Sequence, residues 1–316
     1  MTIDSPKVSI LIPVYNRAQY LSACLFSALR QTLQDIEVII VDNCSDDGTW
    51  QLCLDLQASD SRIRVYQNQK NIGPVRNWMR CAELARAPFS KLLFSDDLLE
   101  PNCLLTMLPW FDNDQIGLVY CAATIGASKE YARCAYSTSR KCVMPASHFL
   151  HKIFCHQAPV SPGAVLLRTK DLRSNLCTDF PTSSRQPFAS HGAGPDVLLL
   201  LRTADQYGLV ASTGPEPLVF FRDHSGSFTC SDVSGLISQG YRSALAYYLI
   251  HTKRYVRWFS YLASLWLDDF NKFKTFKPFR QYLLCLQGSG SLTEVFIFSG
   301  FLSFKAFSRL VRKLFS

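Results

Sequence analysis

The sequence predicts an α/β fold in which a mostly parallel central sheet is flanked by helices and followed by a C-terminal helical extension. Three observations support this prediction. Short apolar runs alternate with helix-period segments over the first 125 residues, and residues 234–316 have helical patterns almost throughout. The 48% apolar and 18% charged residues, in a chain of 316, are enough for a sizeable core. Buried strands separated by helices are typical of βαβ units and a parallel sheet.

The expected strands are short apolar runs, and the first two end at Pro13 and Asp42. If the crossovers between them are right-handed, the carboxyl ends of the strands share one edge, where open α/β sheets bind ligands. The expected strands are residues 8–12, 37–41, 62–66, 91–94, 117–120, 164–167 and 218–221. The expected helices lie around residues 21–29, 50–56, 78–84, 146–154 and 195–207, the last beginning at Pro195, a residue suited to a first helical turn.

Charge and cysteine usage exclude several classes of protein. Residues 251–316 carry 11 Lys and Arg against three acidic residues, which accounts for the whole formal net charge of +8. A neutral body with a basic, aromatic tail argues against a nucleic-acid partner, which needs a basic face on the fold. The twelve cysteines include no C-x-x-C pair, and residues 1–7 contain no apolar segment. We therefore expect a cytoplasmic protein without a zinc site or signal peptide.

Acidic residues follow the second and fourth expected strands. Asp42 opens a turn-rich segment that runs to Thr49, and Asp96 and Asp97 follow the fourth strand. We expect these carboxylates to line one cleft, because the strands end at the same edge. Adjacent carboxylates repel each other unless a cation lies beside them, and oxygen ligands favour Mg²⁺ or Mn²⁺. The same residue types also suit turns and helix caps, which leaves a purely structural role open.

Five motifs follow one another between residue 7 and about residue 110. They are VSILIPVYN at 8–16, VIIVD at 38–42, SDDGT at 45–49, NIG at 71–73 and FSDD at 94–97. Together they resemble the family 2 glycosyltransferases of the GT-A (nucleotide-diphospho-sugar transferase) fold. The resemblance implies an enzyme that moves a sugar from a nucleotide-diphosphate donor, expected to be a UDP-sugar, to a hydroxyl of a glycan or lipid-linked glycan.

The resemblance also implies how the donor nucleoside is held. Asp42 is expected to accept a hydrogen bond from the base, usually uracil. Arg76, which follows the NIG motif, is expected to contact the nucleotide. The residues expected to pack beside the base and ribose are Pro13, Val14, Tyr15 and Asn16.

A metal site follows from the same resemblance. Ser95-Asp96-Asp97 matches the D-x-D-type motif of the family, with Asp96 toward the ribose and Asp97 on a Mn²⁺ or Mg²⁺ ion. Ser95 is a departure, since Asp is common at that position, and it is still expected to line the donor site. Further along, the segment from Pro215 to Thr229 looks like the closing strand and loop of the family, in which His224 is expected to reach the metal or the diphosphate.

The second half of the chain contains a candidate base. Residues 196–202, DVLLLLR, resemble the D-x-x-L-x-L-R helix start where the family places its catalytic carboxylate, although Pro195 replaces the customary acid before it. Asp196 is therefore expected to take the proton from the acceptor hydroxyl. The helix dipole alone also favours Asp in a first turn, so a structural role stays open. A single base carboxylate, like the family resemblance, predicts one displacement with inversion.

Three parts of the chain are expected. Residues 1–125 form the nucleotide-sugar-binding half of the GT-A domain, residues 126–233 the acceptor-binding half, and residues 234–316 a helical extension rich in basic and aromatic residues. Residues 292–315 place Lys and Arg among Phe and Leu. Such a helix lies on the inner face of a membrane, as a peripheral contact, packs on the body of the protein, or forms a dimer contact.

Two other functions were weighed against glycosyl transfer. One is a non-catalytic scaffold or partner protein of the same fold, for which Ser95 and Pro195 leave room. The other is a sugar-1-phosphate nucleotidyltransferase, which needs a Gly-rich loop with a basic residue where this chain has Pro13 to Asn16. A dinucleotide dehydrogenase is excluded, because no G-x-G-x-x-G follows the first strand.

Overall fold

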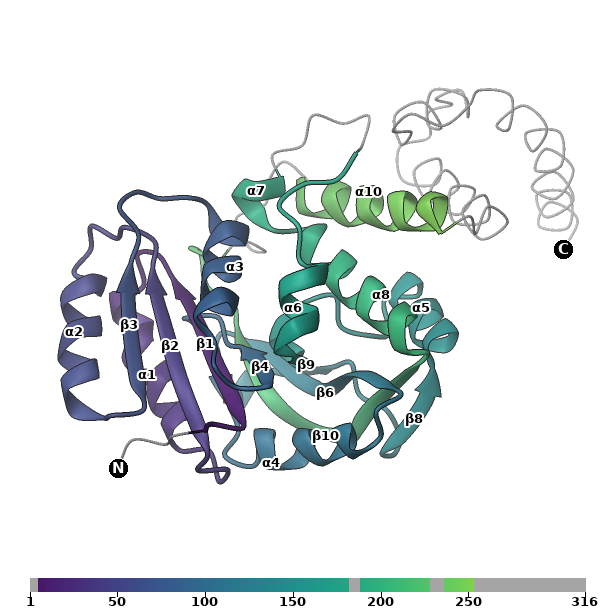
Figure 1. The fold of residues 1–316 in the computed structure, drawn as a ribbon, viewed down its shortest axis with the longest axis horizontal. Helices are drawn as coiled ribbons and strands as arrows, with labels where there is room; N and C mark the ends of the chain where they lie inside the picture. The colour runs from purple at the N-terminus through teal and green to yellow at the C-terminus, as the bar shows by residue number, and fades with distance from the viewer. Residues whose placement is uncertain (1–4, 182–187, 228–235, 253–316) are drawn as a thin grey trace, which may run out of the picture.

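The computed structural model describes residues 5–181, 188–227 and 236–252 of the chain. Within these residues, ten strands form one sheet with the order β3-β2-β1-β4-β9-β6-β10-β5, while β7 pairs with β6 and β8 with β10. Helices lie on both sides of the sheet (Figure 1). Strands β1 to β4 pair in parallel, as do β6 and β10, whereas β9 runs antiparallel between β4 and β6. The expected α/β class is confirmed, with a sheet more mixed than predicted.

The first half of the sheet matches the expected alternation of strands and helices. Along β1, Ile10 and Ile12 pack with α1, and Leu11 packs with α3 on the opposite face. This alternation follows from the two-residue period of a strand. The strands are β1 (Val8–Val14), β2 (Ile36–Asp42), β3 (Ile63–Gln67) and β4 (Phe89–Leu92), and the helices are α1 (Ala18–Leu29), α2 (Thr49–Ser59) and α3 (Pro74–Leu84).

The fourth strand ends earlier than the sequence predicts. It was expected at residues 91–94, but β4 ends at Leu92. Phe94 packs instead against Trp78 of α3, with the ring centroids 5.4 Å apart. An apolar run is therefore divided between the sheet and an aromatic contact, which its pattern alone does not distinguish.

The second half adds two long strands, β6 and β10, which pair in parallel. Their register sets Arg222 beside Gly126, and β5 pairs antiparallel with β10 just after Asp97. The end of β10 is thereby held beside the Asp97 segment.

The remaining strands are β5 (Leu98–Leu99), β6 (Ile116–Gly126), β7 (Arg133–Ala135), β8 (Cys142–Pro145), β9 (Val165–Arg168) and β10 (Leu209–Arg222). The remaining helices are α4 (Cys103–Met107), η1 (Leu108–Asp112), η2 (Lys129–Tyr131), α5 (Ala146–Phe154), η3 (Pro162–Ala164), α6 (Thr169–Asn175), α7 (Phe188–His191), α8 (Pro195–Tyr207) and α10 (Leu236–His251).

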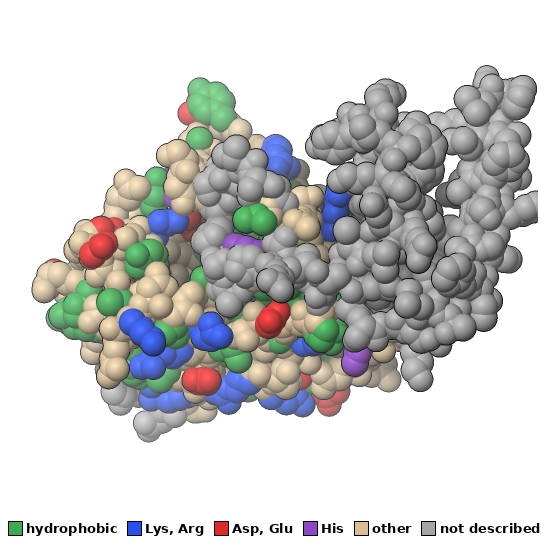
Figure 2. All heavy atoms as spheres, turned by 90° about the horizontal axis from the view of Figure 1, so that it is seen from above, with side chains coloured by type: hydrophobic (Ala, Val, Ile, Leu, Met, Phe, Trp, Pro, Cys, Tyr) green, Lys and Arg blue, Asp and Glu red, His purple; other side chains and the backbone are tan. Residues whose placement is uncertain are grey.

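Helix α10 packs on α8, beside α7 at the top of Figure 1. The described part of the expected extension therefore contacts the expected acceptor half directly. The segment 292–315, with its expected membrane or packing role, lies outside the described residues. In the part of the chain that the structure describes, no helix combines the length and the apolar character needed to cross a membrane. On the face seen in Figure 2, basic and acidic side chains are interspersed along one edge of the body.

Candidate active site

The loops after β1 and β2 are joined by hydrogen bonds. Asn16 has a φ of 51°, in the left-handed region that Asn tolerates better than most residues. Its Nδ2 donates to Asp46 Oδ1 at 2.8 Å, and the Asp46 N–H donates back to Asn16 Oδ1 at 3.0 Å. The Asn16 N–H also donates to Ser45 Oγ at 2.9 Å. The two strand-end loops therefore form one unit.

Asp42 lies fully buried at the end of β2, in register with Val14 of β1. Its Oδ1 accepts a hydrogen bond from Ser45 Oγ at 2.5 Å, and its Oδ2 accepts from the Ser45 N–H at 3.2 Å and from Gln67 Nε2 at 2.9 Å. A carboxylate offers about four lone-pair positions. Three donors from the protein occupy this carboxylate and it has no exposed surface, so the expected hydrogen bond from a nucleotide base stays a prediction.

The other residues expected at the nucleoside differ in exposure. Pro13 and Val14 are buried at the end of β1, whereas the Tyr15 side chain is 42% exposed. Arg76 is exposed in the first turn of α3. Among the described residues, Arg76 forms no hydrogen bond or ion pair with another predicted site residue.

Asparagine side chains tie the loop before α3 to the Asp42 loop. Asn68 Nδ2 donates to the Oδ1 atoms of Asn43 and Asn77, at 2.9 Å in each case. Asn43 Nδ2 donates to Asn71 Oδ1 at 2.8 Å. These contacts hold the NIG motif beside the end of β2.

Asp96 lies at the meeting point of three further segments. Its Oδ2 is 2.9 Å from His224 Nε2 and 3.5 Å from Arg17 Nε. Its carbonyl oxygen accepts a hydrogen bond from Arg222 Nε at 3.0 Å. Arg17 also donates from Nη2 to the Gly226 carbonyl at 2.8 Å. The loop after β1, the Asp96 segment and the loop after β10 are thereby held together.

Asp97 is a buried carboxylate, 6% exposed, beside this cluster. Its Oδ1 accepts a hydrogen bond from the Arg222 N–H at 3.0 Å. Burial, and then the charge of Asp96, raise the pKa of Asp97 well above its usual value, while the Arg222 N–H and the charges of Lys91 and Arg222 act in the opposite direction. Ser95 is buried just before it. A carboxylate that burial and a like charge destabilise in its ionised form is a favourable position for a cation.

The donor set around Asp97 fits a magnesium-type ion. The described residues include no group of three or more His, Cys, Asp or Glu side chains that could hold a metal alone. Mg²⁺ is usually bound through one or two carboxylates and the phosphates of a substrate, not by a cage of protein ligands. Asp97 meets that requirement. His224 Nε2 is hydrogen-bonded to Asp96, and its role as a metal ligand stays a prediction.

Asp196 is buried in the first turn of α8. Its Oδ1 accepts hydrogen bonds from the N–H groups of Gly194 at 2.8 Å and Val197 at 2.7 Å, and its Oδ2 accepts one from the Tyr241 hydroxyl at 2.9 Å. Burial raises the pKa of Asp196 to about 7, although these hydrogen bonds lower it. A carboxyl group that titrates near neutral pH suits a general base.

Two aromatic side chains link the Asp196 turn to the Asp97 segment. Phe94 packs on Trp78. A Cβ on Gly192 would lie 2.3 Å from Trp78 Cη2, so only glycine allows this approach. The Asp196 N–H donates to the Gly192 carbonyl at 3.3 Å. The turn that carries the candidate base therefore packs against Trp78, and Trp78 in turn contacts Phe94, three residues before Asp97.

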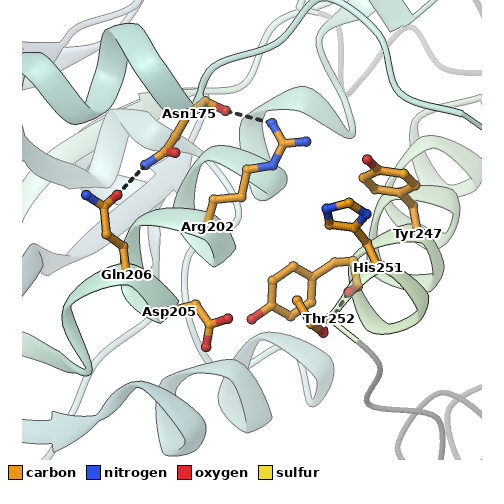
Figure 3. Close-up of a pocket in the computed structure, with 8 residues that line it drawn as sticks. Asn175, Arg202, Asp205, Gln206, Tyr247, His251 and Thr252 are labelled. Atoms are coloured by element: carbon orange, nitrogen blue, oxygen red, sulfur yellow. Dashed lines mark hydrogen bonds between the residues drawn. The ribbon is translucent and has the colours of Figure 1, made fainter.

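A cavity of about 310 Å³ lies between α8 and α10. Figure 3 shows Arg202 and Gln206 of α8 on one side of it, and Tyr247 and His251 of α10 on the other. Arg202 and Gln206 lie toward the end of α8, whereas Asp196 lies at its start. None of the predicted site residues lines this cavity.

Sequence reasoning missed two residues of the site, Arg17 and Tyr241. Arg17 follows the VYN motif directly, so its position beside that motif was an available signal. Tyr241 is 45 residues from Asp196 and reaches it only because α10 packs on α8. No local pattern indicates such a contact.

The raised pKa of Asp196 predicts a pH-dependent cost in stability. The folded chain holds this proton up to about pH 7, whereas an ordinary Asp releases it near 3.8, so the folded state binds the extra proton between these values. Stability therefore falls as the pH rises through this window and reaches its full loss above it. The loss in the free energy of unfolding is at most about 4 kcal/mol, because each pKa unit of the shift is worth about 1.4 kcal/mol. Asp196→Asn has no ionisable carboxyl group at this position and therefore does not show this loss.

Thermal unfolding of Asp196→Asn and the natural chain, between about pH 5 and pH 8, measures this effect. We expect the Tm advantage of Asp196→Asn to grow with pH. Asp205→Asn, an exposed Asp on the same helix, serves as the control and should give a constant difference. An equally constant difference for Asp196→Asn would contradict the raised pKa.

Comparison with known proteins identifies the family to which the chain belongs. Residues 9–173, just over half of the chain, match Glycosyl transferase family 2. The putative glycosyltransferase EpsH of Bacillus subtilis is 36% identical over 120 residues, which cover 38% of this chain and 34% of EpsH. The GalNAc(5)-diNAcBac-PP-undecaprenol beta-1,3-glucosyltransferase of Campylobacter jejuni is 33% identical over 104 residues, covering 33% of this chain and 34% of that enzyme. The match thus spans about a third of the length of either relative.

Solved structures resemble the chain over a larger part of its length. Residues 1–349 of S. aureus TarS, in complex with UDP-GlcNAc, superpose with a TM-score of 0.60 at 18% identity, covering 77% of this chain and 66% of that TarS fragment. The mannosyltransferase PcManGT of Pyrobaculum calidifontis, in complex with GDP-Man and Mn²⁺, has a TM-score of 0.55 at 15% identity, covering 95% of this chain and 81% of that one. At these identities the likeness concerns the fold alone.

Proposed function

This chain belongs to glycosyl transferase family 2 and has the GT-A fold, and from that premise we propose that it transfers a sugar from a UDP-sugar to a hydroxyl of a glycan or lipid-linked glycan. One observation carries the proposal. Hydrogen bonds and ion pairs join the loops after β1, β2 and β10 to the Asp96 segment, so the acidic residues of separate strand ends share one edge of the sheet.

The donor is proposed as a UDP-sugar for two reasons. Asp42 lies at the carboxyl end of β2, where the resemblance to the family places an acceptor for the N–H of uracil. TarS, similar in fold, binds UDP-GlcNAc. The donor-site residues are proposed to be Pro13, Val14, Tyr15, Asn16, Asp42, Arg76, Ser95 and Asp96.

The divalent cation is proposed to be held by Asp97, with His224 as a further ligand. PcManGT, similar in fold, contains Mn²⁺. When bound, such an ion supplies positive charge that stabilises the departing nucleoside diphosphate. Arg222 holds Asp97 in place through its N–H, and Arg17 holds Asp96. Both contacts keep the carboxylates at the edge where the diphosphate would lie.

Asp196 is proposed as the base that takes the proton from the acceptor hydroxyl. Burial brings its pKa to about 7, so near neutral pH it is partly ionised and able to accept a proton. With one base and no second carboxylate assigned to form a glycosyl-enzyme, the sugar is transferred in a single displacement with inversion. The name of the Campylobacter relative includes a lipid-linked acceptor, which supports the acceptor class proposed here.

The division of labour along the chain is part of the same proposal. Residues 1–125 bind the donor, residues 126–233 bind the acceptor, and residues 234–316 form the C-terminal extension. Attachment to the inner face of a membrane through residues 292–315 remains a prediction. Liposome flotation of the chain with and without these residues tests it, and equal partition of both forms would refute it.

Calorimetric titration of UDP, GDP and dTDP, each with and without Mn²⁺, tests the donor assignment. We expect UDP to bind at least about tenfold more tightly than GDP, a difference of about 1.4 kcal/mol, and only in the presence of the metal. Tighter binding of GDP would move the donor to a GDP-sugar. If no nucleotide binds, the non-catalytic scaffold of the same fold replaces the enzyme.

A further inference from the structure

Helix α10 reaches the candidate base through one side chain. The Tyr241 hydroxyl donates to Asp196 Oδ2 at 2.9 Å. The other carboxylate oxygen, Oδ1, is held by the backbone N–H groups of Gly194 and Val197. Among the described residues, Tyr241 is the side chain that donates a hydrogen bond to Oδ2. The orientation of the carboxylate therefore depends on where α10 lies.

Two glycines allow α10 to lie against the turn before Asp196. A Cβ on Gly240 would meet the Ala193 carbonyl oxygen at 2.4 Å, which no side chain allows. Gly194 has a φ of +118°, and a Cβ there would lie 3.2 Å from the Gly240 carbonyl oxygen. The residue before Tyr241 is therefore at its closest possible approach to the turn that presents the base.

The surroundings of Asp196 make this hydrogen bond important. Burial raises the pKa of Tyr136, and the nearby Asp196 charge raises it further. The charge of Arg133 acts in the opposite direction. Burial, and then Asp196, raise the pKa of Tyr241 well above its usual value, so it stays a protonated donor. His191 at the end of α7 accepts from the Ala193 N–H through Nδ1, at 3.2 Å. Among the described residues, the groups that donate hydrogen bonds to the Asp196 carboxylate are the N–H groups of Gly194 and Val197 and the Tyr241 hydroxyl.

We propose that Tyr241 is a positioning residue for the glycosyl transfer reaction: its hydroxyl holds the Asp196 carboxylate in one orientation and stabilises its ionised form. The inference rests on the proposed function of Asp196 as the base. It also places α10, the first part of the expected extension, inside the active site. Residues 236–252 therefore belong with the catalytic body of the protein.

The first test measures the ionisation of Asp196 without any substrate. Carbon-13 NMR of Asp carboxyl groups, with the Asp196 signal identified by its loss in Asp196→Asn, follows the titration of this one group. In Tyr241→Phe the pKa of Asp196 should rise by about 1, the size expected for one hydrogen bond to a charged group. Tyr247→Phe removes a hydroxyl from the same helix away from Asp196 and should leave the titration unchanged. An unchanged titration in Tyr241→Phe would overturn the inference.

The second test measures turnover, with water in place of the unknown acceptor. The probes are UDP-glucose, UDP-galactose and UDP-GlcNAc with Mn²⁺, and the readout is UDP release across the pH range. Tyr241→Phe should lower the rate about fivefold at pH 7 and about tenfold at lower pH, and regain much of it at higher pH, because a base with a raised pKa ionises later. UDP affinity should not change. A rate lowered equally at every pH would indicate a structural role only and would count against the proposal.

Gly240→Ala provides a second variant that leaves the Tyr241 hydroxyl in place. Its Cβ displaces α10 from the Ala193 turn, so the pKa of Asp196 should rise here as well, with UDP affinity unchanged. An unchanged pKa would contradict the role of the close approach. The two hypotheses are separable, because a natural chain that binds no nucleotide refutes the proposed function, whereas the titrations report on Tyr241 in either case.

Discussion

Asp97→Asn is expected to abolish metal-dependent UDP binding, with an affinity loss of at least about a hundredfold. Asp97 is buried, and burial together with the Asp96 charge leaves its ionised form destabilised without a cation. Removing one partner of a buried charge pair typically costs about 3–5 kcal/mol, which corresponds to about 10² to 10⁴ in affinity. The Asn side chain still accepts the Arg222 N–H, so the segment keeps its position and the lost charge is the main change.

Calorimetry of UDP with and without Mn²⁺ measures this loss. Asp55→Asn, an exposed acidic residue on α2, is the matched control and should bind UDP like the natural chain. The weak binding that remains in Asp97→Asn should no longer respond to Mn²⁺. If this variant kept metal-dependent binding, Asp97 would be removed from the metal site.

Asp196→Asn is expected to keep UDP affinity and to lose turnover by about 10² to 10⁴, the range contributed by a general base. Asn preserves the shape of the side chain and accepts the Gly194 and Val197 N–H groups, but it cannot accept a proton. The loss should therefore fall on the catalytic rate constant and not on donor binding. Retained turnover would remove Asp196 from the mechanism.

The pH dependence of the natural chain provides a second measurement of the same group. The active form of a base is ionised, and burial raises the pKa of Asp196 to about 7. The rate should consequently rise with pH up to about 7 and then level off, with the ionisation of Asp196 as the acidic limb. A rate that is already constant from about pH 5 would indicate a base with an ordinary pKa.

Local patterns in the sequence predict much of the fold. The expected helices at 146–154 and 195–207 coincide with α5 and α8, and α8 begins at Pro195, a residue suited to a first helical turn. The antiparallel insertion of β9 between β4 and β6 could not be predicted in this way, since it depends on pairing between segments far apart in the chain. The short strands β7 and β8 have too few residues for a periodic signal.

The candidate site likewise contains residues that local patterns predict and residues that only the packing of distant segments brings together. The acids at the strand ends were expected near one another, and the structure places Arg17, Asp96 and His224 in contact at one edge of the sheet. The catalytic and binding roles of these residues remain predictions. Tyr241 illustrates what local reasoning cannot reach, because its contact with Asp196 arises from the packing of two helices and the absence of a side chain at Gly240.

A crystal structure with UDP and Mn²⁺, with the metal located by its anomalous signal, tests the whole arrangement most directly. We expect the anomalous peak at the Asp97 carboxylate, with the diphosphate oxygens as further ligands, and the uracil hydrogen-bonded to Asp42. A metal bound elsewhere, or a uracil placed away from Asp42, would contradict the donor site derived from the strand ends of this sheet.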